Sequence, residues 1–309
     1  MKQQRLSLLT SPGWDDYELV DSGNLRKLER FGPYRFVRPE PQAMWQPRLD
    51  SQYWQSDGEF ILGKDSANDS DAGRWHLQQH LPDSWEMRYQ SLQFLARPTP
   101  FRHLGFFPEQ AAHWDWCADA IRKFITKHDR PPRVLNLFAY SGLASLHAAA
   151  AGAEVIHLDA SKKAIAHAFE NRDLSSMQTA PIRFIIDDAT GFVDREIRRQ
   201  RKYDGIILDP PKYGRGPKGE FWKIEENLTS LLAKCRELLS EDALFLLLTI
   251  YAIRASSLAA HYAVANALDG LDGHLESGEL ALQETPMTNE DQDSGRYVAQ
   301  ANYARWRSL

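Results

Sequence analysis

The chain has 309 residues, of which 43% are hydrophobic and 26% are charged, and its formal net charge is -5. This composition is that of an ordinary globular protein and excludes a disordered tail, a collagen-like repeat and a coiled coil. Two cysteines, Cys117 and Cys235, are too few for a disulfide framework or for a zinc site of their own. The longest apolar run, residues 243–248, is far shorter than the roughly 18 residues that span a bilayer. The N-terminus lacks the apolar segment of a secretion signal, so we expect a cytoplasmic protein with no membrane partner.

Residues 1–95 are predicted to form a small β-rich domain. This part of the chain has short apolar stretches that are separated by Pro, Gly, Asp and Asn. Short alternating stretches between turn residues are typical of β-strands. The clearest of these stretches are residues 34–38, 60–62 and 85–89.

Residues 96–309 are predicted to form a second domain of the α/β class. From residue 133 on, apolar runs alternate with helix-prone segments, and the runs are apolar on both faces, as the strands of a parallel sheet covered by helices must be. This alternation predicts a doubly wound sheet. The expected strands are residues 133–138, 154–159, 182–187, 203–209 and 243–249, and residues 273–283 and 297–306 are expected to form a closing hairpin.

The first expected strand leads into a loop, residues 136–142, that contains one glycine, Gly142. Ligands of such sheets bind at the carboxyl ends of the strands. A dinucleotide fold needs three glycines there, so that the backbone can approach a pyrophosphate. An adenosyl ligand without phosphates needs only a tight turn. The loop therefore disfavours a nicotinamide dehydrogenase.

Acidic residues follow the next strands in register. Asp159 ends the second strand, 17 residues after Gly142, where a carboxylate can accept hydrogen bonds from both hydroxyls of a ribose. The third strand ends in Asp187, Asp188 and Ala189, where a carboxylate and a backbone N–H can read an adenine edge. For any one of these residues alone, a helix cap is the better explanation. Their joint placement after successive strands favours a ligand site.

The fourth strand ends in Asp209-Pro210-Pro211-Lys212. Prolines have no N–H and stiffen the chain, so this turn presents carbonyl oxygens beside the Asp209 carboxylate. Converging acceptors suit an amino group, either of a substrate or of a bound cofactor. The alternative is a rigid turn without a binding role.

These residues carry a resemblance to a known family. From residue 96 on, the chain resembles the class I S-adenosylmethionine-dependent methyltransferases, and more narrowly the branch that contains the large-subunit ribosomal RNA cytosine-5 methyltransferases. The resemblance implies S-adenosyl-L-methionine as cofactor and a Rossmann-like sheet of strand order 3-2-1-4-5-7-6, with the last strand antiparallel. The matching stretches are residues 101–110, 136–142, 158–161, 187–189 and 209–212.

The resemblance also implies roles for individual residues. Asp159 would bind the ribose, Asp188 the adenine, and the 136–142 loop with Asp209 the methionine end. The expected catalytic residues are Asp209, Pro210, Lys212 and Tyr213, and no metal is expected. The expected cofactor-binding residues are Gln110, Asn136, Phe138, Tyr140, Ser141, Gly142, Asp159, Ala160, Ser161, Asn171, Asp188, Ala189 and Asp209.

One part of the family pattern is missing. The cytosine-5 enzymes carry a nucleophilic cysteine just after the fifth strand, where this chain reads Leu248-Thr249-Ile250-Tyr251. Cys235 lies in an amphipathic helical stretch, where core packing is its expected role. We therefore expect direct methyl transfer. Tyr251 either faces the acceptor or is a core aromatic.

Two basic segments bear on the acceptor. Residues 195–202 are expected to be a solvated helix face, whereas residues 212–218 flank the expected reaction centre, where positive charge suits a phosphate backbone. Tyr213 and the pair Phe221-Trp222 add aromatic rings on which an unstacked base can lie. RNA, and ribosomal RNA in particular, is the favoured acceptor. The alternatives are a methyltransferase for a protein or small molecule and a non-catalytic adenosyl-binding protein. The sequence leaves open the target nucleotide, the methylated atom and the oligomeric state.

Overall fold

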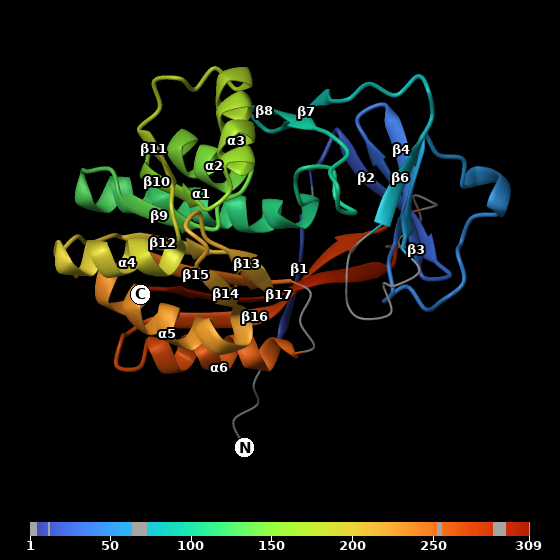
Figure 1. Ribbon diagram of the computed structural model, residues 1–309. Coiled ribbons are helices and arrows are strands. Elements are labelled where there is room, and N and C mark those ends of the chain that lie inside the picture. Colours follow the sequence, from blue (N-terminus) through green and yellow to red (C-terminus); the bar gives the residue numbers. More distant parts are fainter. Residues whose placement is uncertain (1–4, 12, 64–72, 252–254, 287–294, 309) are drawn as a thin grey trace. The chain divides into compact units, whose positions relative to one another are not determined.

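The computed structural model describes residues 5–11, 13–63, 73–251, 255–286 and 295–308, and the chain divides into two compact units (Figure 1). The large unit comprises Met1–Leu9, Ala112–Leu280 and Gln300–Leu309, and the small unit comprises Thr10–Ala111 and Ala281–Ala299. The sequence suggested a single boundary after residue 95. The compact units instead place residues 96–111 and 281–299 with the N-terminal strands.

The large unit is built on an eight-stranded sheet. Five of its strands, β9, β10, β11, β12 and β15, are parallel, and β17 is antiparallel to β15. When these five strands are numbered one to five in chain order, with β16 sixth and β17 seventh, the order is 3-2-1-4-5-7-6 as predicted. The short strand β1 extends the sheet beyond β16 and was not predicted. The sheet runs β1 (Ser7–Thr10), β16 (His274–Gln283), β17 (Tyr297–Arg307), β15 (Phe245–Ile250), β12 (Gly205–Leu208), β9 (Arg133–Leu137), β10 (Glu154–Asp159) and β11 (Ile182–Ile186).

Helices cover both faces of this sheet (Figure 1). Successive side chains of a strand point to opposite faces, so each strand supplies both layers of the core. In β12, Ile206 and Leu208 pack in the layer that contains α4, α5 and α6, while Ile207 packs in the layer that contains α1 and α2. The confirmed fold is therefore a doubly wound α/β sheet. The helices are α1 (Ala111–His128), α2 (Leu143–Ala150), α3 (Lys162–Leu174), α4 (Ala189–Arg198), α5 (Ile224–Leu238) and α6 (Ser257–Ala267).

The small unit is β-rich, as the sequence predicted. Its five-stranded sheet is antiparallel apart from the parallel pair β4 and β5. Aromatic rings fill its core: Phe36 and Trp85 stack with ring centres 5.5 Å apart. Its elements are β2 (Tyr17–Gly23), β3 (Arg26–Phe31), β4 (Tyr34–Pro39), η1 (Ser51–Tyr53), β5 (Gly58–Leu62), β6 (Gly73–Leu77), the hairpin of β7 (Trp85–Tyr89) with β8 (Leu92–Ala96), and η3 (Pro108–Gln110).

Between β12 and α5 the large unit carries a further small hairpin, made of β13 (Tyr213–Arg215) and β14 (Phe221–Lys223). Among the described residues, no helix has both the length and the apolar character that crossing a membrane requires.

Candidate functional site

The loop that follows β9 has an unusual backbone. Phe138, Tyr140 and Gly142 all have positive φ angles, of 59°, 48° and 90°. The left-handed region costs a residue with a side chain about 1–2 kcal/mol, and such strained residues cluster at ligand-binding sites. The neighbouring strand β10 holds the loop in place, because its Leu158 carbonyl accepts the Ala139 N–H at 3.0 Å. The strain therefore marks this loop as a candidate ligand contact.

Helix α3 supports the same loop from the other side. The Asn171 side-chain amide donates to the Ser141 carbonyl at 2.9 Å. Asn171 is buried, so its role is to position the loop. Gly142 begins α2 and packs closely on α3: a Cβ atom at residue 142 would lie 3.0 Å from the Cβ of Ala168. Both the space and the backbone angle at this position thus require glycine.

Asp159, the last residue of β10, accepts one backbone N–H on each carboxylate oxygen. Tyr140 donates to Oδ2 at 2.9 Å and Ser161 donates to Oδ1 at 2.8 Å. Burial raises the pKa of Asp159, and the two N–H donors oppose that shift. Each oxygen keeps a further lone pair, so the carboxylate can accept from two neighbouring hydroxyls. Ser161 caps α3 through its hydroxyl, which accepts the Ala164 N–H at 3.2 Å, and Ala160 lies between the two.

Asp188 follows β11 and caps α4, because its Oδ2 accepts the Gly191 N–H at 2.7 Å. The sequence left a helix cap as the other explanation for each of these acids, and one oxygen of Asp188 has that role. Asp187 beside it forms an ion pair with Arg195. Ala189 begins α4, and the first N–H groups of a helix have no acceptor within the helix. The end of β11 thus offers the second oxygen of Asp188 together with an N–H.

The turn after β12 is joined to the loop after β9 through Trp222. The indole N–H of Trp222 donates to the Pro211 carbonyl at 2.7 Å, and its ring packs on Phe138 with centres 5.0 Å apart. Trp222 is only 4% exposed, so it cannot serve as the stacking surface that the sequence suggested. Asp209 is half-buried at the end of the strand, and Pro210 is buried.

These residues share one edge of the sheet. Strands β10, β9 and β12 are parallel neighbours, and β11 pairs with β10 on its other side. Their carboxyl ends therefore bring together the loop from Phe138 to Gly142, Asp159, Asp188 and Asp209. Strand order reverses at β9, which is where ligands of doubly wound sheets bind.

Two expected cofactor residues do not follow a strand of the large sheet. Asn136 is within β9 and buried; its side-chain amide donates to the Ser145 hydroxyl at 2.9 Å, inside the packing of α2 on the sheet. Gln110 ends η3 in the small unit. Asn171 lies within α3 and contacts the loop after β9 through its hydrogen bond to Ser141. The remaining expected cofactor-binding residues lie at or directly after the ends of β9, β10, β11 and β12.

The residues considered for covalent chemistry lie in the core. Cys117 on α1 and Cys235 on α5 are buried. Burial raises the pKa of both thiols, that of Cys235 to about 12. Tyr251, after β15, is partly buried and packs against the hydrophobic cluster of Leu280, Ala301 and Tyr303, which favours its alternative role as a core aromatic.

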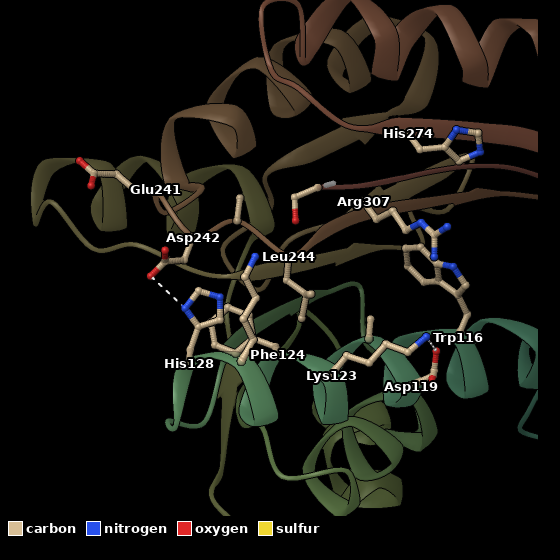
Figure 2. A pocket seen from close by; sticks show the side chains of 14 residues that line it. Trp116, Asp119, Lys123, Phe124, His128, Glu241, Asp242, Leu244, His274 and Arg307 are labelled. Atoms are coloured by element: carbon tan, nitrogen blue, oxygen red, sulfur yellow. Dashed lines mark ion pairs between the residues drawn. The ribbon is translucent and has the colours of Figure 1, made fainter.

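A groove of about 790 Å³ lies at the opposite edge of the sheet, where the parallel strands begin. Figure 2 shows its lining of mixed charge, with ion pairs Lys123–Asp119 and His128–Asp242. Leu244, just before β15, and Arg307, at the end of antiparallel β17, belong to this lining. The groove is therefore separate from the edge that carries Asp159 and Asp209.

Comparison with known proteins identifies the class of this fold and site. The S-adenosylmethionine-dependent methyltransferase family model matches residues 56–259. A crystal structure of a SAM-dependent methyltransferase from Agrobacterium tumefaciens is 44% identical, has a TM-score of 0.90, and the match covers 98% of this chain and 94% of that chain. The chain belongs to the S-adenosylmethionine-dependent methyltransferase family.

Curated relatives match over shorter stretches. Ribosomal RNA large subunit methyltransferase I of Aeromonas salmonicida is 31% identical over 116 residues, which are 37% of this chain and 26% of that protein. Ribosomal RNA large subunit methyltransferase K/L of Shewanella baltica is 35% identical over 121 residues, which are 38% of this chain and 17% of that protein. The chain thus matches about a quarter or less of the length of these relatives.

Proposed function

We propose that this methyltransferase acts on RNA in the cytoplasm, with ribosomal RNA as the favoured acceptor, and that the acceptor attacks the methyl group directly. The observation that carries the proposal is the joint placement of Asp159, Asp188 and Asp209 around the strained loop after β9. The proposal assigns cofactor and acceptor binding to residues 96–309 and treats residues 1–95 as a small N-terminal domain, although residues 96–111 pack with the small unit.

The donor and acceptor groups at this edge fit S-adenosyl-L-methionine. The lone pairs left on Asp159 suit the two ribose hydroxyls, and Asp188 with the Ala189 N–H suits the amino group and a ring nitrogen of adenine. The backbone from Phe138 to Gly142 and Asp209 suit the charged methionine end. When bound, S-adenosyl-L-methionine supplies an electrophilic methyl group on a sulfonium centre.

The turn after β12 serves the acceptor side. Direct transfer requires an in-line approach, so the protein contributes mainly position and electrostatics. Asp209 orients an N–H or O–H of the acceptor by accepting its hydrogen bond. Pro210 and Pro211 fix the turn, and the Lys212 carbonyl accepts the Ile224 N–H at 3.0 Å, which ties the turn to the start of α5. The buried, protonated thiols of Cys117 and Cys235 take no part.

Two observations favour RNA over a protein or small molecule. The curated relatives described above are named as ribosomal RNA large subunit methyltransferases. In addition, Arg215 and Lys218 are exposed cations directly after the Asp209 turn, in a chain whose net charge is -5. Cations beside the site can contact phosphates, which position RNA without reading its sequence.

The test is methyl transfer from labelled S-adenosylmethionine to ribosomal RNA isolated from cells that lack the gene. Wild type should label one RNA fragment, which mass spectrometry then maps. Asp209→Asn should lose about a hundredfold or more in turnover, the scale of a lost electrostatic contact at a reacting centre. Turnover is measured at saturating S-adenosylmethionine, because Asp209 also faces the methionine end of the cofactor in this proposal. Label that enters protein or small metabolites while RNA stays unlabelled would contradict the RNA proposal.

A further inference from the structure

The hairpin β13–β14 has two distinct faces. Tyr213 pairs with Lys223, Gly214 with Trp222, and Arg215 with Phe221. Residues directly opposite each other share a face, and successive residues along a strand alternate. Gly214 and Trp222 therefore form one face, the inner face. Tyr213, Arg215, Phe221 and Lys223 form the other, the outer face.

The inner face rests on the reaction centre. Trp222 donates to the Pro211 carbonyl at 2.7 Å and packs on Phe138. A Cβ at residue 214 would lie 3.4 Å from the ring of Pro211, so Gly214 also faces this turn. The hairpin is thus fixed both to the turn after β12 and to the loop after β9.

The outer face carries two exposed aromatic rings. Tyr213 is 54% exposed and Phe221 is 60% exposed, whereas Trp222, which follows Phe221 and lies on the inner face, is 4% exposed. Burying such rings would be favourable, and leaving them in water has no structural benefit. Arg215 on the same face is exposed, and the Nζ of Lys212 lies 5.5 Å from the centre of the Tyr213 ring. Lys223 is held by an ion pair with Glu226.

The direction of this face excludes the target base as its occupant. The target atom must reach the methyl group beside Phe138 and Asp209, which is the side that the inner face covers. A base on the outer face lies on the far side of the hairpin from Phe138. It must therefore belong to another nucleotide.

We propose that Tyr213 and Phe221 stack an unpaired base of a nucleotide next to the target, with Arg215 contacting its phosphate. This proposal rests on the proposed RNA function and assigns Tyr213 to substrate selection. Aromatic stacking tolerates every base but requires the base to be unstacked from its neighbours, and cations beside it attract the backbone. The hairpin thus selects a single-stranded segment beside the methylated nucleotide.

The experiment measures binding and turnover separately, on the full chain with S-adenosylhomocysteine present for binding. Fluorescence anisotropy reports the affinity for a labelled single-stranded RNA of about 12 nucleotides, a length that spans an ordinary single-strand site, and for the same RNA annealed to its complement. Tyr213→Ala and Phe221→Ala should each weaken single-strand binding about 5- to 150-fold, the range that loss of one stacked base gives. Duplex binding should stay unchanged, and Tyr213→Phe should bind like wild type.

Kinetics of methyl transfer to ribosomal RNA then show whether the two rings contact the target base or a neighbouring base. Both alanine variants should raise KM for RNA by a similar factor and leave S-adenosylhomocysteine affinity unchanged. Phe221→Ala, which changes a residue with no expected catalytic role, should also leave kcat unchanged. Tyr262→Ala is the matched control, because Tyr262 on α6 is also 54% exposed.

Each contrary outcome is informative. A fall in kcat at unchanged KM would mean that the rings contact the target base, and unchanged single-strand affinity would remove the stacking site altogether. If wild type binds single-stranded RNA through these two rings but methylates none, the proposed function fails and the stacking site stands. If the wild type methylates RNA and both alanine variants do so with the wild-type KM, the proposed function stands and the stacking site is refuted.

Discussion

The backbone N–H of Tyr140 donates to Oδ2 of Asp159 at 2.9 Å, so the carboxylate expected to hold the ribose also holds the strained loop after β9. Tyr140 has a φ of 48°, a conformation that its own side chain disfavours. The hydrogen bond to Asp159 offsets part of that cost. The proposed ribose contact and the loop geometry are therefore linked through one carboxylate.

Replacing Asp159 should weaken cofactor binding. In Asp159→Ala, two charge-assisted hydrogen bonds to ribose hydroxyls are lost, at roughly 1.5–3 kcal/mol each, and the affinity for S-adenosylhomocysteine should fall at least tenfold. Calorimetric titration measures this. Asp173→Ala, which removes a carboxylate that is about half exposed on α3, should titrate like wild type. An unchanged dissociation constant in folded Asp159→Ala would remove the residue from the site.

The same residue predicts a pH dependence. Burial raises the pKa of Asp159 above that of an ordinary aspartate. Compared with the unfolded chain, the folded protein without ligand therefore favours the protonated carboxyl. By linkage, this carboxyl stabilises the fold at low pH, and that contribution is lost as pH rises through the raised pKa. Ribose binding needs the carboxylate. Affinity for S-adenosylhomocysteine should therefore fall as pH drops through the raised pKa, starting above the usual aspartate range. Asp159→Asn should lack this step, and an identical pH profile in the two proteins would contradict the assignment.

Gly142→Ala should be damaging for two separable reasons. Its φ of 90° strains any residue with a side chain, and the added Cβ would lie 3.0 Å from the Cβ of Ala168. Gly270→Ala is the matched control, because Gly270 has a φ of 78° with nothing within 4 Å of an added Cβ. We expect Gly270→Ala to lose about 1 kcal/mol of unfolding free energy, and Gly142→Ala to lose more and to bind S-adenosylhomocysteine weakly. Equal losses in chemical denaturation, with binding intact, would show that the contact with Ala168 is harmless.

Local sequence patterns predicted the strands of the sheet and the acids at its carboxyl edge, because strand runs and the residues that end them are adjacent in the chain. The order of the strands came from the family resemblance, because pairing between strands that are distant in the chain leaves no local pattern. Trp222 shows where this reasoning stops. Its burial depends on which face of a short hairpin meets Pro211 and Phe138, and no periodicity in three-residue strands reveals that. The placement of residues 281–299 has a similar cause: Glu284 and Arg296 join a charged network with Asp21, more than 260 residues away in the chain. The sequence set a helix cap against a ligand contact for Asp188. One oxygen caps α4 and the other is a candidate ligand contact, so the two roles are compatible.

Cys117 and Cys235 should be dispensable for methyl transfer. Both thiols are buried, and with a pKa of about 12 Cys235 carries essentially no thiolate at neutral pH. Cys117→Ser and Cys235→Ser should keep wild-type turnover, while the buried hydroxyl lowers stability by about 1–3 kcal/mol. Turnover and thermal unfolding measured on the same samples separate the two effects. A stable variant without turnover, or a covalent adduct between either thiol and RNA, would show that a cysteine acts as the nucleophile.

The basic residues after the Asp209 turn should set the salt dependence of RNA binding. Each phosphate that a cation neutralises on a single strand contributes about 0.7 to the slope of log affinity against log salt concentration. Changing Lys212, Arg215 and Lys218 together to Gln should therefore flatten that slope by about 2 and weaken RNA binding most at low salt. S-adenosylhomocysteine affinity should stay unchanged, because the three side chains serve the acceptor. A second triple variant, with Lys127, Arg198 and Arg201 changed to Gln, removes the same charge from the groove at the opposite edge and from the basic stretch at the end of α4. If the two triple variants flatten the slope equally, RNA binding reflects overall charge and the turn has no special role. If only the second does so, RNA lies along the end of α4 or the opposite edge, and the acceptor site must be sought there.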